Sequence, residues 1–247
     1  FAPLDEQKGA VIQITNDSKA TFDNCKFTGS IESVLFLEDQ SETELNGCFF
    51  ENVGDNNLLL SSNSSAKLMD TTFESNTKFG VYALRNSKIF GNNCLFTEHQ
   101  SVGVLCLENS RTELSGCVFS EKCETGVLIG EKSFGSISFC QFDNTTSAIR
   151  VEKMSIGNLS GCHFLRGNSY AVTYSDSTGT VYECLFEDVL TALYITGHQA
   201  DPTFHNCEIV KAKQPTVSIA NCSSPTFKGV KFLECKSLIA VATLFSD

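Results

Sequence analysis

Cysteine is the residue whose number and spacing in this sequence point most directly to chemistry. The chain has 247 residues and 12 cysteines, and eight of these recur at intervals of 22 or 23 residues or twice that: Cys25, Cys48, Cys94, Cys117, Cys140, Cys162, Cys184 and Cys207. Neighbouring members of such a column would be close enough for disulfides. A regular column nevertheless favours small buried thiols that are retained for steric fit, which predicts a reducing compartment.

The four remaining cysteines are Cys106, Cys123, Cys222 and Cys235. We expect Cys123 and Cys235 to lie in loops and to be the more exposed thiols. No Cys-x-x-Cys pair occurs, so a structural zinc site is not expected and no metal ligand or cofactor is assigned.

Acidic residues form a second periodic set: Glu51, Glu74, Glu98, Glu121, Asp143, Glu187, Asp188 and Glu234. Carboxylates in such a column could supply the six to eight oxygens that Ca²⁺ prefers. The interpretation that we favour is the solvated edge of a bend.

Three of the four histidines, His163, His198 and His205, fall in one third of the chain near Arg150 and Tyr194, and we expect them to lie on different strands rather than in a common pocket.

The element that positions these residues is a repeat of 22–23 residues, written ten times. Self-similarity at a period of 20–50 residues indicates a repeat architecture. Its anchor is Cys-x-Phe, as in Cys117 and Phe119, with Ser110 seven residues before the anchor. The residues two after the anchor are Phe27, Phe50, Phe73, Phe96, Phe119, Phe142, Phe164, Phe186, Ile209 and Phe232.

Each repeat contains three short alternating runs, which are typical of strands rather than helices. A residue that tolerates positive φ separates the last two runs, as Asn93 and Gly116 do, although Phe139 and Glu183 break this rule. Three strands and three bends make one coil, and successive coils should stack as parallel strands about 4.8 Å apart. The prediction is an all-β parallel β-helix of about ten coils. We expect one domain over residues 1–247, with a tail at 1–8 and coils at 9–243, as part of a larger polypeptide.

The pattern of Gly-Val-x-Val, a Ser turn and Gly/Asn-Cys-x-Phe resembles the right-handed parallel β-helix of pectate-lyase-like proteins over nearly the whole chain. That resemblance implies a fold that is shared by polysaccharide lyases and hydrolases, adhesins and phage tailspikes, and by non-catalytic scaffolds such as the β-helix regions of certain F-box proteins. The resemblance does not choose among these functions. Enzymes of this fold need clustered Asp, Lys or Arg on one strand face, where this chain offers only Arg150 with Glu152 and the distant Glu38. Gly197-His198 resembles the Gly-His of polygalacturonases, but the paired Asp-Asp and Arg-Ile-Lys motifs are absent.

The same strand carries the candidate binding site on its outward side. In coils two to six its outward residues are apolar, and we define them as the apolar strip: Phe36, Leu59, Tyr82, Leu84, Leu105, Leu107 and Leu128. Contiguous apolar surface marks a binding site or a covered face. We expect this strip to bind a protein partner or a second copy of the chain. The alternatives are cover by other parts of the same polypeptide, or stacking against sugars.

The net charge of −11 disfavours nucleic acid and anionic membranes as partners. No run of 18 apolar residues occurs, so no membrane span is expected. The sequence therefore favours a non-catalytic scaffold for protein–protein interaction or self-association. A carbohydrate-binding or polysaccharide-cleaving enzyme is the alternative, and a surface adhesin or tailspike-like protein is the third hypothesis.

Overall fold

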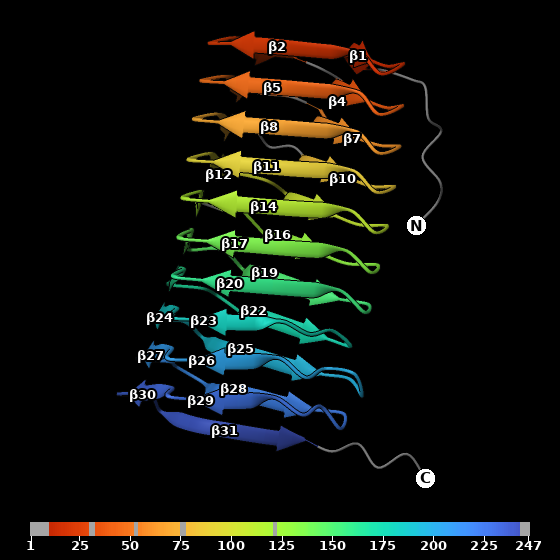
Figure 1. Cartoon of the computed structure of the whole chain (residues 1–247). Helices are drawn as coiled ribbons and strands as arrows, with labels where there is room; N and C mark the ends of the chain where they lie inside the picture. The colour runs from red at the N-terminus through yellow and green to blue at the C-terminus, as the bar shows by residue number, and fades with distance from the viewer. Residues whose placement is uncertain (1–9, 30–32, 52–53, 75–77, 121–122, 243–247) are drawn as a thin grey trace.

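The computed structural model describes residues 10–29, 33–51, 54–74, 78–120 and 123–242. These residues form 31 short strands, and no helix occurs among them. The expected tail at residues 1–8 lies outside the described residues. The strands wind into a rod of stacked coils that runs from β1 to β31 (Figure 1). The all-β solenoid of about ten coils is therefore confirmed.

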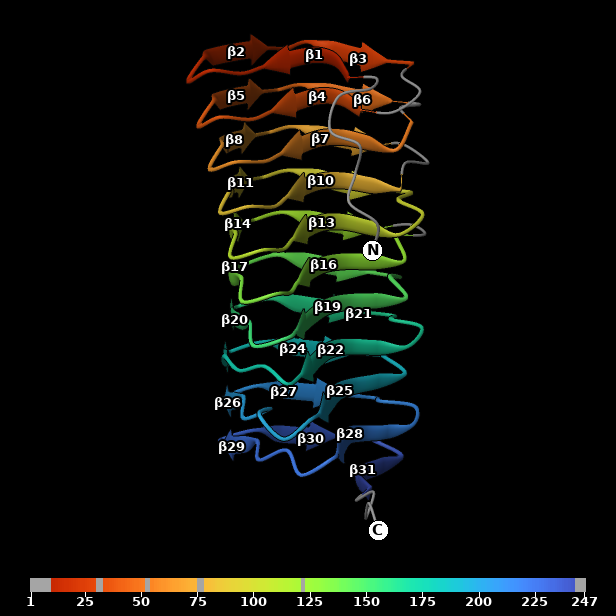
Figure 2. The same cartoon turned by 90° about the vertical axis from the view of Figure 1, so that its right-hand side faces the viewer.

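Three parallel sheets make up the sides of the rod, and we call them sheets A, B and C. Sheet A, whose strands follow one another down the rod in Figure 2, has 11 strands: β1 (Ala10–Ile14), β4 (Ser33–Leu37), β7 (Asn56–Leu60), β10 (Phe79–Ala83), β13 (Val102–Cys106), β16 (Thr125–Ile129), β19 (Ser147–Glu152), β22 (Tyr170–Ser175), β25 (Thr191–Thr196), β28 (Pro215–Ala220) and β31 (Ser237–Ala242). Sheet B has 10 strands: β2 (Lys19–Asp23), β5 (Glu42–Asn46), β8 (Ser65–Met69), β11 (Lys88–Asn92), β14 (Arg111–Ser115), β17 (Phe134–Ser138), β20 (Ile156–Ser160), β23 (Thr180–Tyr182), β26 (Thr203–His205) and β29 (Thr226–Lys228). Sheet C has 10 strands: β3 (Lys26–Thr28), β6 (Phe49–Glu51), β9 (Thr72–Glu74), β12 (Leu95–Thr97), β15 (Val118–Ser120), β18 (Gln141–Asp143), β21 (His163–Leu165), β24 (Leu185–Glu187), β27 (Glu208–Val210) and β30 (Lys231–Leu233).

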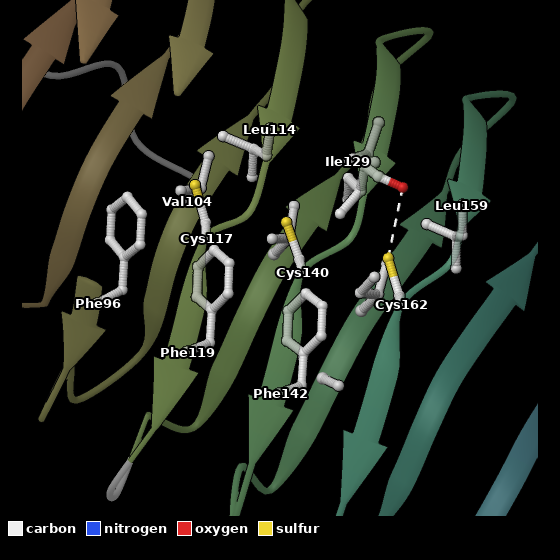
Figure 3. Packing of buried hydrophobic residues seen from close by; sticks show 14 of the residues in the cluster. Phe96, Val104, Leu114, Cys117, Phe119, Ile129, Cys140, Phe142, Leu159 and Cys162 are labelled. Carbon is white, nitrogen blue, oxygen red and sulfur yellow. Dashed lines mark hydrogen bonds between the residues drawn. The ribbon is translucent and has the colours of Figure 1, made fainter. Parts of the chain in front are cut away.

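The phenylalanine column forms the aromatic centre of the core. Phe96 pairs in register with Phe73 above it and with Phe119 below it. From Phe27 to Phe186 the rings stack with centroids 4.6–5.2 Å apart, and Figure 3 shows three of them side by side. This distance is the spacing of neighbouring strands, so the repeat length itself brings the rings into contact.

The same rings explain why sheet A has small residues one step before its inward side chains. A Cβ atom added to Gly126 would lie 2.8 Å from the ring of Phe142, and one added to Gly103 would lie 3.1 Å from Phe119. The carbonyl oxygen of the next sheet A strand is closer still, at 2.6 Å for Gly126 and 2.8 Å for Gly103, so ring and backbone together exclude a side chain at these two positions.

Cysteine and serine columns complete the corners of each coil. Each anchor thiol lies close to the carbonyl two residues before it, as Cys117 Sγ does with Ser115 at 3.6 Å. Thr71 takes the place of a cysteine in one coil, and its hydroxyl donates to the Met69 carbonyl at 3.0 Å. The Ser110 amide donates to Ser133 Oγ of the next coil at 3.1 Å, and the serine ladder continues in the same way.

The bend between sheets B and C has positive φ in every coil, including the two that broke the sequence rule. Phe139 has φ 53° and Glu183 has φ 51°. The side chain of one coil can lie over a glycine of the next, since a Cβ on Gly116 would lie 2.6 Å from Asn93 Oδ1, and one on Gly161 would lie 2.8 Å from the Phe139 ring. Phe139 is tolerated because its side chain lies over a glycine and projects into solvent.

Replacement of Phe139 by Asn should therefore stabilise the protein by about 1 kcal/mol, because Asn adopts positive φ more readily than a bulky residue. The aromatic side chain is 71% exposed, so its removal forfeits little buried area. Urea denaturation of the two proteins measures the change. A lower midpoint for Phe139→Asn would contradict this account of the bend.

Candidate binding surface

Five residues of the apolar strip, Phe36, Leu59, Tyr82, Leu105 and Leu128, lie in strands of sheet A, and Leu84 and Leu107 directly follow β10 and β13. Strand pairing places Phe36 beside Leu59, Leu59 beside Tyr82, Tyr82 beside Leu105, and Leu105 beside Leu128. One column of large side chains therefore crosses five neighbouring strands without a gap.

The side chains of the strip are less exposed than a flat surface stripe would be. Leu105 is 4% exposed, whereas Leu59, Tyr82 and Leu128 remain half-buried. Phe36, Leu84 and Leu107 are also buried. The expected open stripe is thus a packed layer with three partly open members.

A second hydrophobic cluster, separate from the interior core, accounts for part of this burial. Val102, Leu105 and Leu107 form its centre, and Phe79, Tyr82 and Leu128 pack against it. The rings of Phe79 and Tyr82 lie 5.4 Å apart. Burial also raises the pKa of the Tyr82 hydroxyl.

Further down sheet A the outward face changes from apolar to aromatic and charged. The rings of Tyr170 and Tyr194 stack with centroids 4.6 Å apart. Arg150 donates from Nε and Nη2 to Glu152 Oε1, at 2.9 and 2.5 Å. Sequence analysis missed the tyrosine pair because Tyr170 aligns with Thr191 and reaches Tyr194 only by leaning across the sheet.

The carboxylates of this face are poorly placed for glycoside hydrolysis. That reaction needs two carboxyl groups about 5–9.5 Å apart. Glu38 directly follows β4, and Glu152 is the last residue of β19. These two strands are five coils apart in sheet A, which is roughly 24 Å at the strand spacing. Glu152 is moreover held in an ion pair by Arg150. These two residues therefore do not form the required pair.

The three histidines that are close in the sequence lie on different sides of the rod. His163 on sheet C lies 3.3 Å from Glu187, and His205 ends β26 on sheet B. His198 lines a shallow groove of about 660 Å³ with Lys132, Met154, Asp176 and others at the turns between sheets A and B. Arg150 and Tyr194 both lie in strands of sheet A, whereas His163 and His198 lie outside that sheet. Tyr174 points inward, and its hydroxyl donates to the Gly157 carbonyl at 2.6 Å.

Ion pairs between coils involve three members of the acidic column. Glu51 lies 2.7 Å from Lys26, Asp188 lies 3.0 Å from Lys213, and Asp143 pairs with Arg166. Glu121 lies outside the described residues. Within the described ranges, no group of three or more His, Cys, Asp or Glu residues is arranged to hold a metal ion.

One expectation about the thiols is wrong. Cys123 is fully buried, and its Sγ lies 3.2 Å from the Thr125 carbonyl. Cys222 is the exposed cysteine, and Cys235 is half-buried. All 12 cysteines are free thiols in this structure.

The match to a protein family fits this geometry. The model of the right-handed β-helix region matches residues 5–119 and 102–244. The chain belongs to the right-handed β-helix family. This β-helix has no match among curated proteins.

Solved structures similar to this β-helix share its fold at low sequence identity. The catalytic domain of a GH87 α-1,3-glucanase in complex with nigerose has 9% identity and a TM-score of 0.50 over 96% of this chain and 63% of its own. The tailspike of an Acinetobacter phage has 10% identity and a TM-score of 0.49 over 92% of this chain and 46% of its own. The chain thus spans about half to two thirds of these proteins, and the likeness concerns the fold alone. None of the described segments forms a helix that could span a membrane.

Proposed function

We propose that this β-helix is a non-catalytic scaffold that binds a protein partner, or a second copy of itself, through the apolar strip of coils two to six. The observation that carries the proposal is the unbroken column of large apolar side chains on the outward face of sheet A. A solvated sheet face normally carries polar residues, so a second hydrophobic cluster there favours a docking role.

Tyr82 is the residue with which to test docking, because it is central and half-buried. Leu105 is a poorer choice, since a charge at a side chain that is 4% exposed would destabilise the fold itself. Tyr82→Glu should weaken association about tenfold or more, as loss of a central aromatic anchor does at interfaces. Light scattering on a sizing column measures self-association of the two proteins.

The matched control is Phe139→Glu, which removes an exposed aromatic side chain outside the strip. It should leave the oligomeric state unchanged. Monomers for the native chain and both variants at high protein concentration would exclude strong self-association and leave a foreign partner. Equal weakening by both substitutions would contradict the role of the strip.

Carbohydrate binding is the second candidate, and the exposed tyrosine pair favours it. Tyr170 is 38% exposed and stacks on Tyr194 near the Arg150–Glu152 ion pair, which is a combination of apolar ring and polar groups that suits a sugar. The glucanase structure that shares the fold holds nigerose. Calorimetric titration with nigerose and related oligosaccharides distinguishes this function from protein docking.

The free thiols support a further proposal, that the protein works in a reducing compartment. A surface adhesin would be expected to carry oxidised cysteines or glycans instead. Alkylation of the denatured protein without prior reduction, followed by mass spectrometry, counts the reduced cysteines by the number of alkyl groups added.

A further inference from the structure

Six of the anchor cysteines follow one another down the inside of the rod on consecutive coils. All are free thiols that are at most 2% exposed: Cys94, Cys117, Cys140, Cys162, Cys184 and Cys207. Figure 3 shows three of them side by side. Two further anchors, Cys25 and Cys48, lie on the first two coils, and Thr71 separates them from the six. We call these eight cysteines the thiol ladder.

Neighbouring thiols of the ladder are in contact. Cys94 and Cys140 both donate a hydrogen bond to the sulfur of Cys117. Cys184 donates in the same way to Cys162 and Cys207. The strand spacing of about 4.8 Å would place an ion midway between two stacked side chains about 2.4 Å from each. That value is close to the bond of about 2.3 Å between a zinc ion and a thiolate, so the gap between two coils has the size of a metal site.

Backbone amides are directed at the same sulfur atoms. In the coil that lacks a cysteine, Thr71 Oγ1 accepts a hydrogen bond from the Cys48 amide at 3.4 Å. Within the ladder, the amides of Cys94 and Cys117 donate likewise to the sulfurs of Cys117 and Cys140. Such hydrogen bonds stabilise the negative charge of a thiolate and are a usual part of metal–thiolate sites. They offset part of the cost of a charge in the apolar interior.

The number of sulfur ligands selects the kind of ion. Each gap between two coils offers a pair of sulfurs, and the residues that the structure describes contain no group of three or more His, Cys, Asp or Glu that could hold a metal ion. Structural Zn²⁺ takes four ligands, so a sulfur pair does not suit it. Soft thiolate ligands favour Cu(I), which forms linear complexes with two sulfurs.

We propose that the thiol ladder binds Cu(I) between neighbouring coils, each ion held linearly by two thiolates. Two sulfur–hydrogen bonds break and two copper–sulfur bonds form, so two protons are released, one negative charge remains on the complex and no electron is transferred. The eight anchors make four separate pairs: Cys25 with Cys48, Cys94 with Cys117, Cys140 with Cys162, and Cys184 with Cys207. Uptake requires transient opening of the coils and should be slow. The site lies inside the rod and is independent of docking through the apolar strip.

Retention of Cu(I) by the folded chain tests the proposal. The protein is incubated for hours with Cu(I) under nitrogen and then treated with excess bathocuproine disulfonate, which removes weakly held copper. Native mass spectrometry should show four ions per chain, and X-ray absorption at the copper edge should show two sulfur neighbours per ion. Bound copper should also raise the thermal unfolding midpoint, because the ladder exists only in the folded chain.

Cys117→Thr interrupts the ladder with little disturbance of the fold, because Thr71 already occupies an anchor position. This variant leaves Cys94 without a neighbouring thiol, so the retained copper should fall from four ions per chain to three. Adding Cys162→Thr should lower it to two. Cys222→Ser removes the exposed thiol outside the ladder and should retain all four ions.

Circular dichroism establishes that each variant is folded. A folded native chain that loses all its copper to the chelator overturns the proposal. So does copper that Cys222→Ser removes and Cys117→Thr leaves in place, or copper with three or more sulfur neighbours. Uptake that occurs only in denaturant also overturns it, since the unfolded chain is then the ligand.

Discussion

Phe119→Ala is expected to lower the free energy of unfolding by about 3–5 kcal/mol, the range measured when a buried aromatic side chain is truncated to alanine. Phe119 is fully buried, and its ring stacks on Phe96 at 4.7 Å and on Phe142 at 4.8 Å. Truncation removes both ring contacts and leaves a cavity that the strands on either side cannot close. Urea denaturation followed by circular dichroism measures the loss.

Phe139→Ala is the matched control, since it removes the same atoms from a side chain that is 71% exposed. We expect a change of less than about 0.5 kcal/mol there. Phe119→Leu should fall between the two, because it refills part of the cavity. A loss at Phe119 no larger than that at Phe139 would show that the aromatic column does not hold the coils together.

Acid should destabilise the protein through His99. This histidine lies in the loop between β12 and β13, yet it is fully buried, and a Cβ atom on Gly80 would meet its Nε2 at 2.9 Å. Burial lowers its pKa to about 4 from the usual 6.5, and a hydrogen bond to the Phe73 backbone opposes the shift only partly. The folded protein therefore keeps His99 neutral over a pH range in which the unfolded chain protonates it.

The sign of the effect follows from proton binding. Between about pH 6.5 and 4 the unfolded state binds more protons at this site, so stability falls as pH falls. The full difference corresponds to about 3 kcal/mol, present above pH 6.5 and lost by pH 4. His99→Gln removes the titrating group and keeps a hydrogen-bond donor, so its stability should depend less on pH over this range.

Denaturation of wild type and His99→Gln at a series of pH values gives the difference between their free energies of unfolding. The contributions of the surface carboxylates cancel in this difference. A constant difference between wild type and His99→Gln from pH 7 to pH 4 would contradict the buried neutral state of His99. His205→Gln, on sheet B, serves as the control for loss of a half-buried histidine.

The repeat in the sequence determined the architecture. A period of 22–23 residues, with Phe two residues after the anchor in all coils but the one with Ile209, favours a solenoid in which identical positions stack at the strand spacing. Phe96, Phe119 and Phe142 therefore lie over one another, as Figure 3 shows, and the outward column from Phe36 to Leu128 follows from the alternation of side chains along a strand. These contacts link residues of fixed separation, so periodicity alone suffices to predict them.

Tertiary structure decided what periodicity leaves open, namely burial and contacts across the columns. Cys123 and His99 lie in loops outside the repeated strands, and only the path of those loops shows that both side chains turn inward. Tyr170 meets Tyr194 by leaning across the sheet, and Leu105 is far less exposed than its outward position suggests. Exposure depends on the bulk and rotamers of neighbours in three dimensions, which a one-dimensional pattern of residue types does not contain.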